Sequence, residues 1–138
     1  MAFSGSFEDR LAIRELLDAY ADAVCVVDAD AWGATWADDG VWELPDLPQV
    51  GTIAGKDNIV AAWQQAMTYF PGVVFVAAVG SIDISGDQAV VRSYTSEVYN
   101  DTDGRVHRDR GRYDDVAVKR GGEWLFKMRR FQIIHRQS

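Results

Sequence analysis

Two residues in this chain carry polar groups that could face a pocket in an apolar interior, Tyr20 and Asp115. Tyr20 carries the only hydroxyl in a stripe of apolar residues that recurs at helical spacing from Ile13 to Val27. A buried tyrosine hydroxyl needs a polar partner, either a backbone carbonyl in the core or a ligand in a pocket. Burial would raise the pKa of Asp115, which could then act as a neutral donor or as a base near pH 7. The alternative for Asp115 is an ordinary ion pair with Arg129 or Arg112.

The remaining reactive side chains favour structural roles. Cys25 could be a nucleophile, but no histidine is placed to activate its thiol, so we predict a small buried hydrophobic residue. His107 lies in a charged segment and is expected in solvent, whereas His135 could fold back over a pocket mouth. The aspartates between residues 28 and 39 suit helix caps and turns, and no cysteine or histidine cluster joins them. The sequence therefore predicts no metal site.

The composition indicates one folded domain over residues 1–138, with 48% hydrophobic and 12% aromatic residues. A formal net charge of −7 argues against binding to nucleic acid or to an anionic membrane surface. No apolar run approaches the roughly 20 residues of a membrane span, and the N-terminus lacks the pattern of a signal peptide. With a single cysteine there is no internal disulfide, and we expect a cytoplasmic protein.

Helical patterns dominate the first half of the chain. Ser6 with Asp9 resembles a capping box, which predicts a helix from Phe7 to about Val26. A short helix over residues 30–37 is expected to follow. The later expectations are a turn at 38–40, a strand over Val41–Leu44, a loop over 45–53 and a helix over 57–69.

Strand patterns take over after Pro71-Gly72. In the last strand the apolar alternation shifts phase, which indicates a β-bulge at Arg129-Arg130 and a bent sheet. The predicted strands are residues 73–84, 88–100, 105–120 and 123–135, joined by tight turns. The order predicts an α+β fold, with helices packed on one side of a strongly curved antiparallel sheet.

Several segments in this order carry a resemblance to a known family. They are Tyr20, the run from Asp28 to Trp42 that ends Asp-Asp-Gly-Val-Trp, the segment Gly55-Lys-Asp-Asn-Ile59, and the run from Tyr113 to Arg129 with its Gly-Gly-Glu-Trp turn. The chain resembles the SnoaL-like, or nuclear-transport-factor-two-like, cone-fold superfamily over nearly its whole length. That superfamily includes dehydratases, isomerases, polyketide cyclases, dehydrochlorinases, small subunits of ring dioxygenases and non-catalytic binders.

The resemblance implies a deep apolar pocket between the sheet and the first helix, with acid–base chemistry and no cofactor. In the dehydratase and dehydrochlorinase branch an Asp–His dyad does this chemistry, but Cys25 and Phe75 stand at those two positions. In the ketosteroid isomerase branch a tyrosine and a protonated aspartic acid donate to an oxyanion. Tyr20 and Asp115 align with these two donors, whereas Leu44 stands where that branch has its general base.

The resemblance thus implies a lyase or isomerase of the dehydratase, isomerase or cyclase type. It would act on a small apolar oxygenated molecule, with Tyr20 and Asp115 as catalytic residues. The alternative is a non-catalytic small-molecule binder, or a small subunit that packs on a larger enzyme subunit. Relatives often form dimers or trimers, so we expect a homo-oligomer with Tyr94 or Val98 near the interface. The expected substrate-binding residues are Val24, Cys25, Trp42, Trp63, Phe75, Tyr113 and Arg129.

Overall fold

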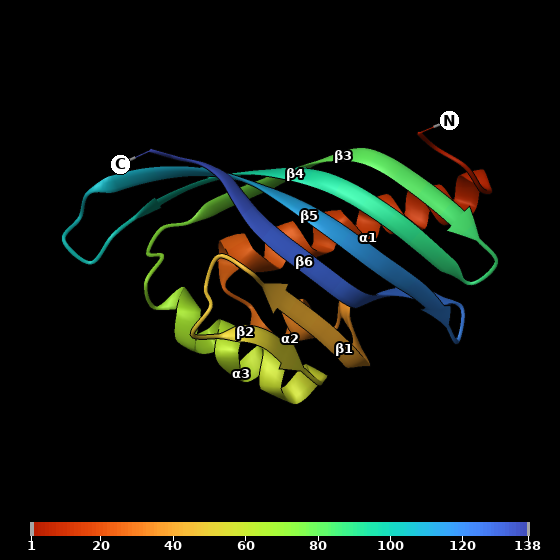
Figure 1. Ribbon diagram of the computed structural model, residues 1–138, viewed down its shortest axis with the longest axis horizontal. Helices are drawn as coiled ribbons and strands as arrows, with labels where there is room; N and C mark the ends of the chain where they lie inside the picture. The colour runs from red at the N-terminus through yellow and green to blue at the C-terminus, as the bar shows by residue number, and fades with distance from the viewer. Residues whose placement is uncertain (1, 138) are drawn as a thin grey trace.

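The computed structural model describes residues 2–137 and places three helices against one sheet (Figure 1). The helices are α1 (Phe7–Val26), α2 (Ala29–Gly33) and α3 (Lys56–Met67). The strands are β1 (Trp36–Leu44), β2 (Gly51–Ala54), β3 (Val74–Ser85), β4 (Gln88–Asn100), β5 (Val106–Arg120) and β6 (Glu123–Gln137). No helix in this part of the chain is long and apolar enough to cross a membrane.

The six strands form a single mixed sheet in the order β2-β1-β6-β5-β4-β3. Strands β3 to β6 form an antiparallel meander, and β1 joins β6 in parallel. Figure 1 shows the long strands arching over α1, while α2, α3, β1 and β2 lie below the arch. The predicted α+β fold, with helices on one side of a strongly curved sheet, is confirmed.

Helix α1 begins and ends where its capping residues predict. The Ser6 side chain accepts a hydrogen bond from the Asp9 backbone N–H at 3.1 Å, which satisfies one of the unpaired donors of the first turn. At the other end Val27 adopts the left-handed conformation, with φ 54°. The inward face of α1, from Ile13 to Val24, packs under the sheet and positions Tyr20 there.

The second helix is shorter and the first strand longer than the sequence predicts. The Phe126 N–H donates to the Thr35 carbonyl at 2.8 Å, and Trp36 pairs with Phe126 in the parallel ladder. Residues 38–40, predicted as a turn, therefore lie within β1, where the register with β6 shifts. Residues 51–54, predicted as loop, form β2 because they pair with β1. Both errors arise because the signals of the local sequence are weaker than the pairing with distant strands.

The register of the last strand with β5 shifts at Lys127 and again at Ile134, and not at Arg129-Arg130. Val116 pairs with Met128 and Ala117 with Phe126, so Lys127 is the extra residue on β6. Arg129 lies on the inward face of the sheet, where the apolar pattern does not lead one to expect an arginine. If Arg129 is assumed to point outward, the alternation of apolar residues seems to change at Arg129-Arg130, two residues after the bulge at Lys127.

Aromatic rings form the core beneath the sheet. The rings of Trp32 and Trp63 stack with their centroids 4.5 Å apart, which joins α2 to α3. Trp42 of β1 meets Trp32 with 5.5 Å between the ring centroids. Because ring contacts of this kind add to the effect of area burial, they fix the lower elements against one another and form one side of a cavity.

Candidate functional site

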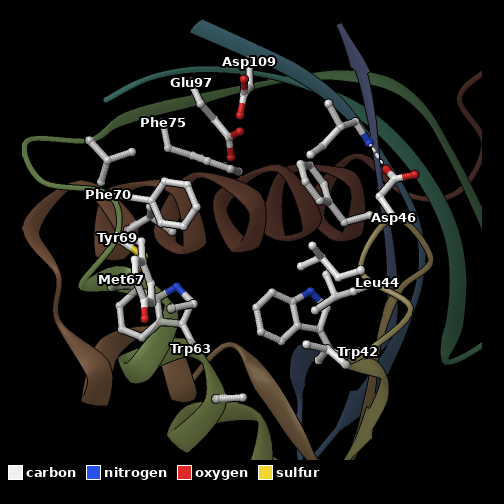
Figure 2. A pocket seen from close by; sticks show the side chains of 18 of the residues that line it. Trp42, Leu44, Asp46, Trp63, Met67, Tyr69, Phe70, Phe75, Glu97 and Asp109 are labelled. Atoms are coloured by element: carbon white, nitrogen blue, oxygen red, sulfur yellow. Dashed lines mark hydrogen bonds between the residues drawn. The ribbon is translucent and has the colours of Figure 1, made fainter. Parts of the chain in front are cut away.

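A cavity of about 600 Å³ lies between the concave face of the sheet, α1, α3 and the β1–β2 segment. This volume is in the range that holds a small organic ligand. Figure 2 shows Trp42 and Trp63 on one side of the cavity and Phe75, Glu97 and Asp109 on the other. Its lining is mostly aromatic and aliphatic, with a few polar groups at separate places, as is typical of ligand sites.

Two tyrosine hydroxyls meet at one side of this cavity. Tyr20 of α1 and Tyr113 of β5 are both buried, both line the cavity, and their hydroxyl oxygens are 2.9 Å apart. Burial raises the pKa of both phenols above the ordinary value, so both are neutral at physiological pH. Two hydroxyls joined by one hydrogen bond keep one further hydrogen, which can be donated to a ligand oxygen.

A buried ion pair lies behind the two tyrosines. Asp115 accepts two hydrogen bonds from Arg129, from Nε at 2.8 Å and from Nη2 at 2.9 Å. The guanidinium carbon of Arg129 lies 4.3 Å from the ring centroid of Tyr20 and 3.6 Å from that of Tyr113. Although burial disfavours its charge, the Asp115 carboxylate raises the pKa of Arg129 above its ordinary value. The cation therefore persists beneath the tyrosine rings.

The structure corrects the role predicted for Asp115. Burial raises the pKa of this carboxyl group, as expected, and the Arg129 guanidinium opposes the rise. Both carboxylate oxygens are bonded to Arg129, and neither residue lines the cavity. The alternative reading, an ion pair with Arg129, is the one that the structure shows. Arg129, held by Asp115, lies against the rings of Tyr20 and Tyr113 outside the cavity lining.

Two acidic side chains line another part of the cavity. Glu97 of β4 and Asp109 of β5 are direct cross-strand partners, and Figure 2 shows their carboxyl groups side by side. The Tyr99 hydroxyl donates to Asp109 Oδ2 at 2.9 Å, and Arg136 Nε lies 3.4 Å from Asp109 Oδ1. Burial and the negative charge of Asp109 raise the pKa of Glu97 to about 7, while the more distant charge of Arg136 opposes this rise. Glu97 can therefore lose and regain a proton near neutral pH.

Most of the predicted binding residues line this cavity. Cys25 does not: its thiol accepts a hydrogen bond from the Phe75 N–H at 3.2 Å and donates to the Phe75 carbonyl at 3.4 Å. Cys25 is partly exposed, whereas the sequence predicts a buried residue. Its two hydrogen bonds join the end of α1 to the edge strand β3. The predicted residues that line the cavity are Tyr20, Val24, Trp42, Trp63, Phe75 and Tyr113.

Neither histidine lines the cavity. His107 is half-buried, although the sequence predicts that it lies in solvent. Its ring stacks on Tyr99, and its Nε2 lies 2.8 Å from Asp101 Oδ2. His135 is exposed on β6 and does not cover the cavity. Within residues 2–137 no group of three or more histidine, cysteine, aspartate or glutamate side chains is arranged to hold a metal ion.

Glu97 and Asp109 were not identified from the sequence as lining residues. A signal for them is present in the alternation of the strands. Glu97 shares its face of β4 with Val91 and Tyr99, and Asp109 shares its face of β5 with Tyr113. Each of the two strands therefore has a carboxylate on its inward, otherwise apolar face. Such a buried polar group indicates a candidate site residue.

Comparisons with known proteins agree with this geometry. The profile of the SnoaL-like domain matches residues 5–130. The chain therefore belongs to the family of proteins with a SnoaL-like domain. Curated protein sequences give no match.

Solved structures with the same fold are similar over nearly the whole chain. A protein provisionally assigned as a scytalone dehydratase, from Novosphingobium aromaticivorans, is 22% identical, with a TM-score of 0.84 over 94% of this chain and 87% of that one. A hexachlorocyclohexane dehydrochlorinase, LinA-type3 from Novosphingobium barchaimii, is 15% identical, with a TM-score of 0.80 over 94% of this chain and 89% of that one. At these identities the likeness establishes the fold.

Proposed function

We propose that this protein is a cofactor-free lyase or isomerase that acts by acid–base chemistry on a small, largely apolar molecule with a carbonyl or hydroxyl oxygen. The observation that carries the proposal is the Tyr20–Tyr113 hydroxyl pair in the lining of an apolar cavity of about 600 Å³. A substrate oxygen that gains negative charge in the transition state would accept the hydrogen that this pair has left to donate. Donors fixed in place before the reaction stabilise such charge without reorganising.

The surroundings of the tyrosines support this role. The Arg129 guanidinium lies against both rings, so a positive charge lies behind the hydroxyls. The mostly apolar lining lowers the local dielectric constant, which strengthens the interaction between the donors and a developing oxyanion. Structural relatives assigned as a dehydratase and a dehydrochlorinase are consistent with proton-transfer chemistry in the same fold.

A second candidate function is non-catalytic binding of an apolar molecule. The mostly apolar lining favours it, because burial of apolar surface alone gives affinity. The two functions differ in one measurable respect: only the enzyme accelerates exchange of a proton on a bound carbonyl compound.

The test is the exchange of carbon-bound hydrogen for deuterium in β-tetralone, followed by NMR in D2O. This ketone has two fused rings, fits the cavity in size, and passes through an enolate when it exchanges. We expect the wild type to exchange the hydrogen between the ring and the carbonyl faster than buffer alone. Tyr20→Phe should slow this exchange by about tenfold or more, because the remaining Tyr113 hydroxyl loses the hydrogen bond that holds it in place, while the ring at position 20 is kept.

The control for the fold is the near-ultraviolet circular dichroism of the variant, which should match that of the wild type. Exchange at the buffer rate in the wild type would contradict the enzyme proposal. If β-tetralone nevertheless bound in the cavity, the second candidate would replace it.

A further inference from the structure

We propose that Glu97, held beside Asp109 in the cavity, is the group that removes a proton from carbon in the bound ligand. The inference deepens the proposed function and rests on it, since that function needs a base and the sequence offers none at the positions the family uses. Leu44 and Phe75, which stand at two of those positions, have no titratable group.

Placement is the first argument. Glu97 lines the cavity from β4, with Phe75 of β3 opposite it on one side and Asp109 of β5 on the other. Figure 2 shows its carboxyl group directed toward the cavity interior. Within residues 2–137, no hydrogen bond or ion pair holds this carboxyl group. Its oxygens are therefore free to accept a proton from a ligand.

The asymmetry of the two carboxylates is the second argument. Asp109 is 3% exposed and is held by Tyr99 and Arg136, whereas Glu97 has neither partner. Asp109 thus acts as a fixed negative neighbour, and Glu97 is the member of the pair that can exchange a proton. Two carboxyl groups whose surroundings differ in this way are typical of acid–base sites.

The charged and titratable groups around Glu97 determine its response to pH. Asp109 on β5 raises the pKa of Glu97, and Arg136 on β6 lowers it. Tyr99 and Tyr113 also face this region, and the pKa of Tyr99 is raised to about 12, so both phenols stay neutral where Glu97 titrates. With a pKa of about 7, Glu97 is half ionised at neutral pH and can act both as base and, after the transfer, as acid.

The ligand class follows from these positions. The carboxyl pair and the hydroxyl pair both belong to the lining of one cavity, which is otherwise mostly aromatic and aliphatic. We infer a ring compound with a carbon–hydrogen bond that is made acidic by a neighbouring electron-withdrawing oxygen function. An anionic group on the ligand would be unfavourable near this pair, because it would add to the charge of Asp109 that already raises the pKa of Glu97.

Nitrobenzisoxazole tests the inference without knowledge of the natural substrate. Its reaction needs one base. The carboxylate takes the hydrogen from the ring carbon, the electrons of that bond form the third bond of a nitrile, and the ring nitrogen–oxygen bond breaks. The electron pair of that bond stays on oxygen, and the product is a coloured cyano-nitrophenolate. No oxidant, metal or second reactant is required.

We expect the wild type to open this ring faster than acetate at the same carboxylate concentration, with a rate that rises through an inflection near pH 7. Glu97→Gln should lower the rate by about a hundredfold or more, since the amide cannot accept the proton. Asp109→Asn should move the inflection to lower pH, because a negative neighbour is lost, and Arg136→Gln should move it to higher pH.

Asp87→Asn is the matched control. Asp87 is an exposed carboxylate in the turn between β3 and β4, and it does not line the cavity. Its rate and inflection should equal those of the wild type.

The inference is overturned if Glu97→Gln keeps the wild-type rate, if the wild type is no faster than acetate, or if Asp109→Asn leaves the inflection unchanged. β-Tetralone exchange separates this failure from failure of the proposed function. Exchange that persists in Glu97→Gln would leave the enzyme proposal standing and remove Glu97 from it. If the wild type opens the nitrobenzisoxazole ring through Glu97 but does not exchange β-tetralone hydrogen, Glu97 is a base and the proposed function is wrong.

Discussion

The hydroxyl oxygens of Tyr20 and Tyr113 lie 2.9 Å apart, although the residues are 93 positions apart in the chain. The contact joins α1 to β5, and both side chains are buried in the lining of the cavity. A hydrogen bond between two neutral phenols can be rearranged at little cost when a third acceptor arrives. This relationship is the basis of the donor function that we assign to the pair.

Removal of one member of the buried ion pair should be costly. Asp115→Leu leaves the Arg129 guanidinium uncompensated at 1% exposure, and we expect the free energy of unfolding to fall by about 3–5 kcal/mol. The double variant Asp115→Leu, Arg129→Met should lose much less, because no charge remains buried. Urea unfolding measures both. Equal losses in the single and double variants would contradict the ion pair as the source.

Cys25 should be structural. Cys25→Ala leaves the N–H and the carbonyl of Phe75 without their thiol partner, and we expect a loss of about 1 kcal/mol in unfolding free energy. Exchange of β-tetralone hydrogen should be unchanged in this variant. Loss of exchange with the fold intact would instead make Cys25 part of the reaction.

The titration of Glu97 should also appear in the stability of the protein. An unfolded glutamate loses its proton near its ordinary pKa of 4.5, whereas folded Glu97 keeps it to about pH 7. Between these values the native state binds more protons, so stability falls as pH rises, by on the order of 3 kcal/mol. Glu97→Gln should lack this increment. The measurement is urea unfolding of both proteins at about pH 4.5 and about pH 8, and parallel pH dependences would contradict the shift.

The outer face of the sheet should form contacts between copies of the chain. Tyr94 is 42% exposed there, Val76 55% and Val98 37%, on the adjacent strands β3 and β4. Exposed apolar patches on a soluble domain mark interaction surfaces, so we expect a dimer or trimer and a monomer after Tyr94→Lys. Light scattering distinguishes these states, and a wild-type mass of 15.4 kDa at micromolar concentration would contradict the expectation.

The extent to which the sequence predicts the fold depends on where each signal lies. Helix α1 and the hairpins around Gly86 and Gly121 are marked by local caps, periods and turns, and their boundaries are predicted nearly to the residue. The extension of β1 and the existence of β2 depend on pairing with strands that are distant in the chain. A local pattern cannot report such pairing.

The residues of the candidate site also differ in whether the local sequence or the pairing of distant strands reveals them. Tyr20 stands out because it interrupts an apolar stripe, and the structure places it in the cavity. For Asp115 the sequence leaves two roles open, and the choice depends on the antiparallel register of β5 and β6, with its bulge at Lys127, which places Arg129 inward beside Asp115. Glu97 was missed because its importance comes from its cross-strand partner Asp109, and the register of a hairpin with a long turn is not evident from residue types.

The affinity for para-nitrophenolate in the wild type and in Tyr20→Phe tests the central claim most directly. This anion imitates an enolate, and its absorbance reports binding. We predict that Tyr20→Phe weakens it by about 10- to 100-fold, or roughly 1–3 kcal/mol, because a charge-assisted hydrogen bond is lost. The affinity for para-nitrotoluene, which has the same shape without the charge, should not change. Equal affinity of the two proteins for para-nitrophenolate, with the fold intact, would contradict the claim and make Tyr20 an ordinary core tyrosine.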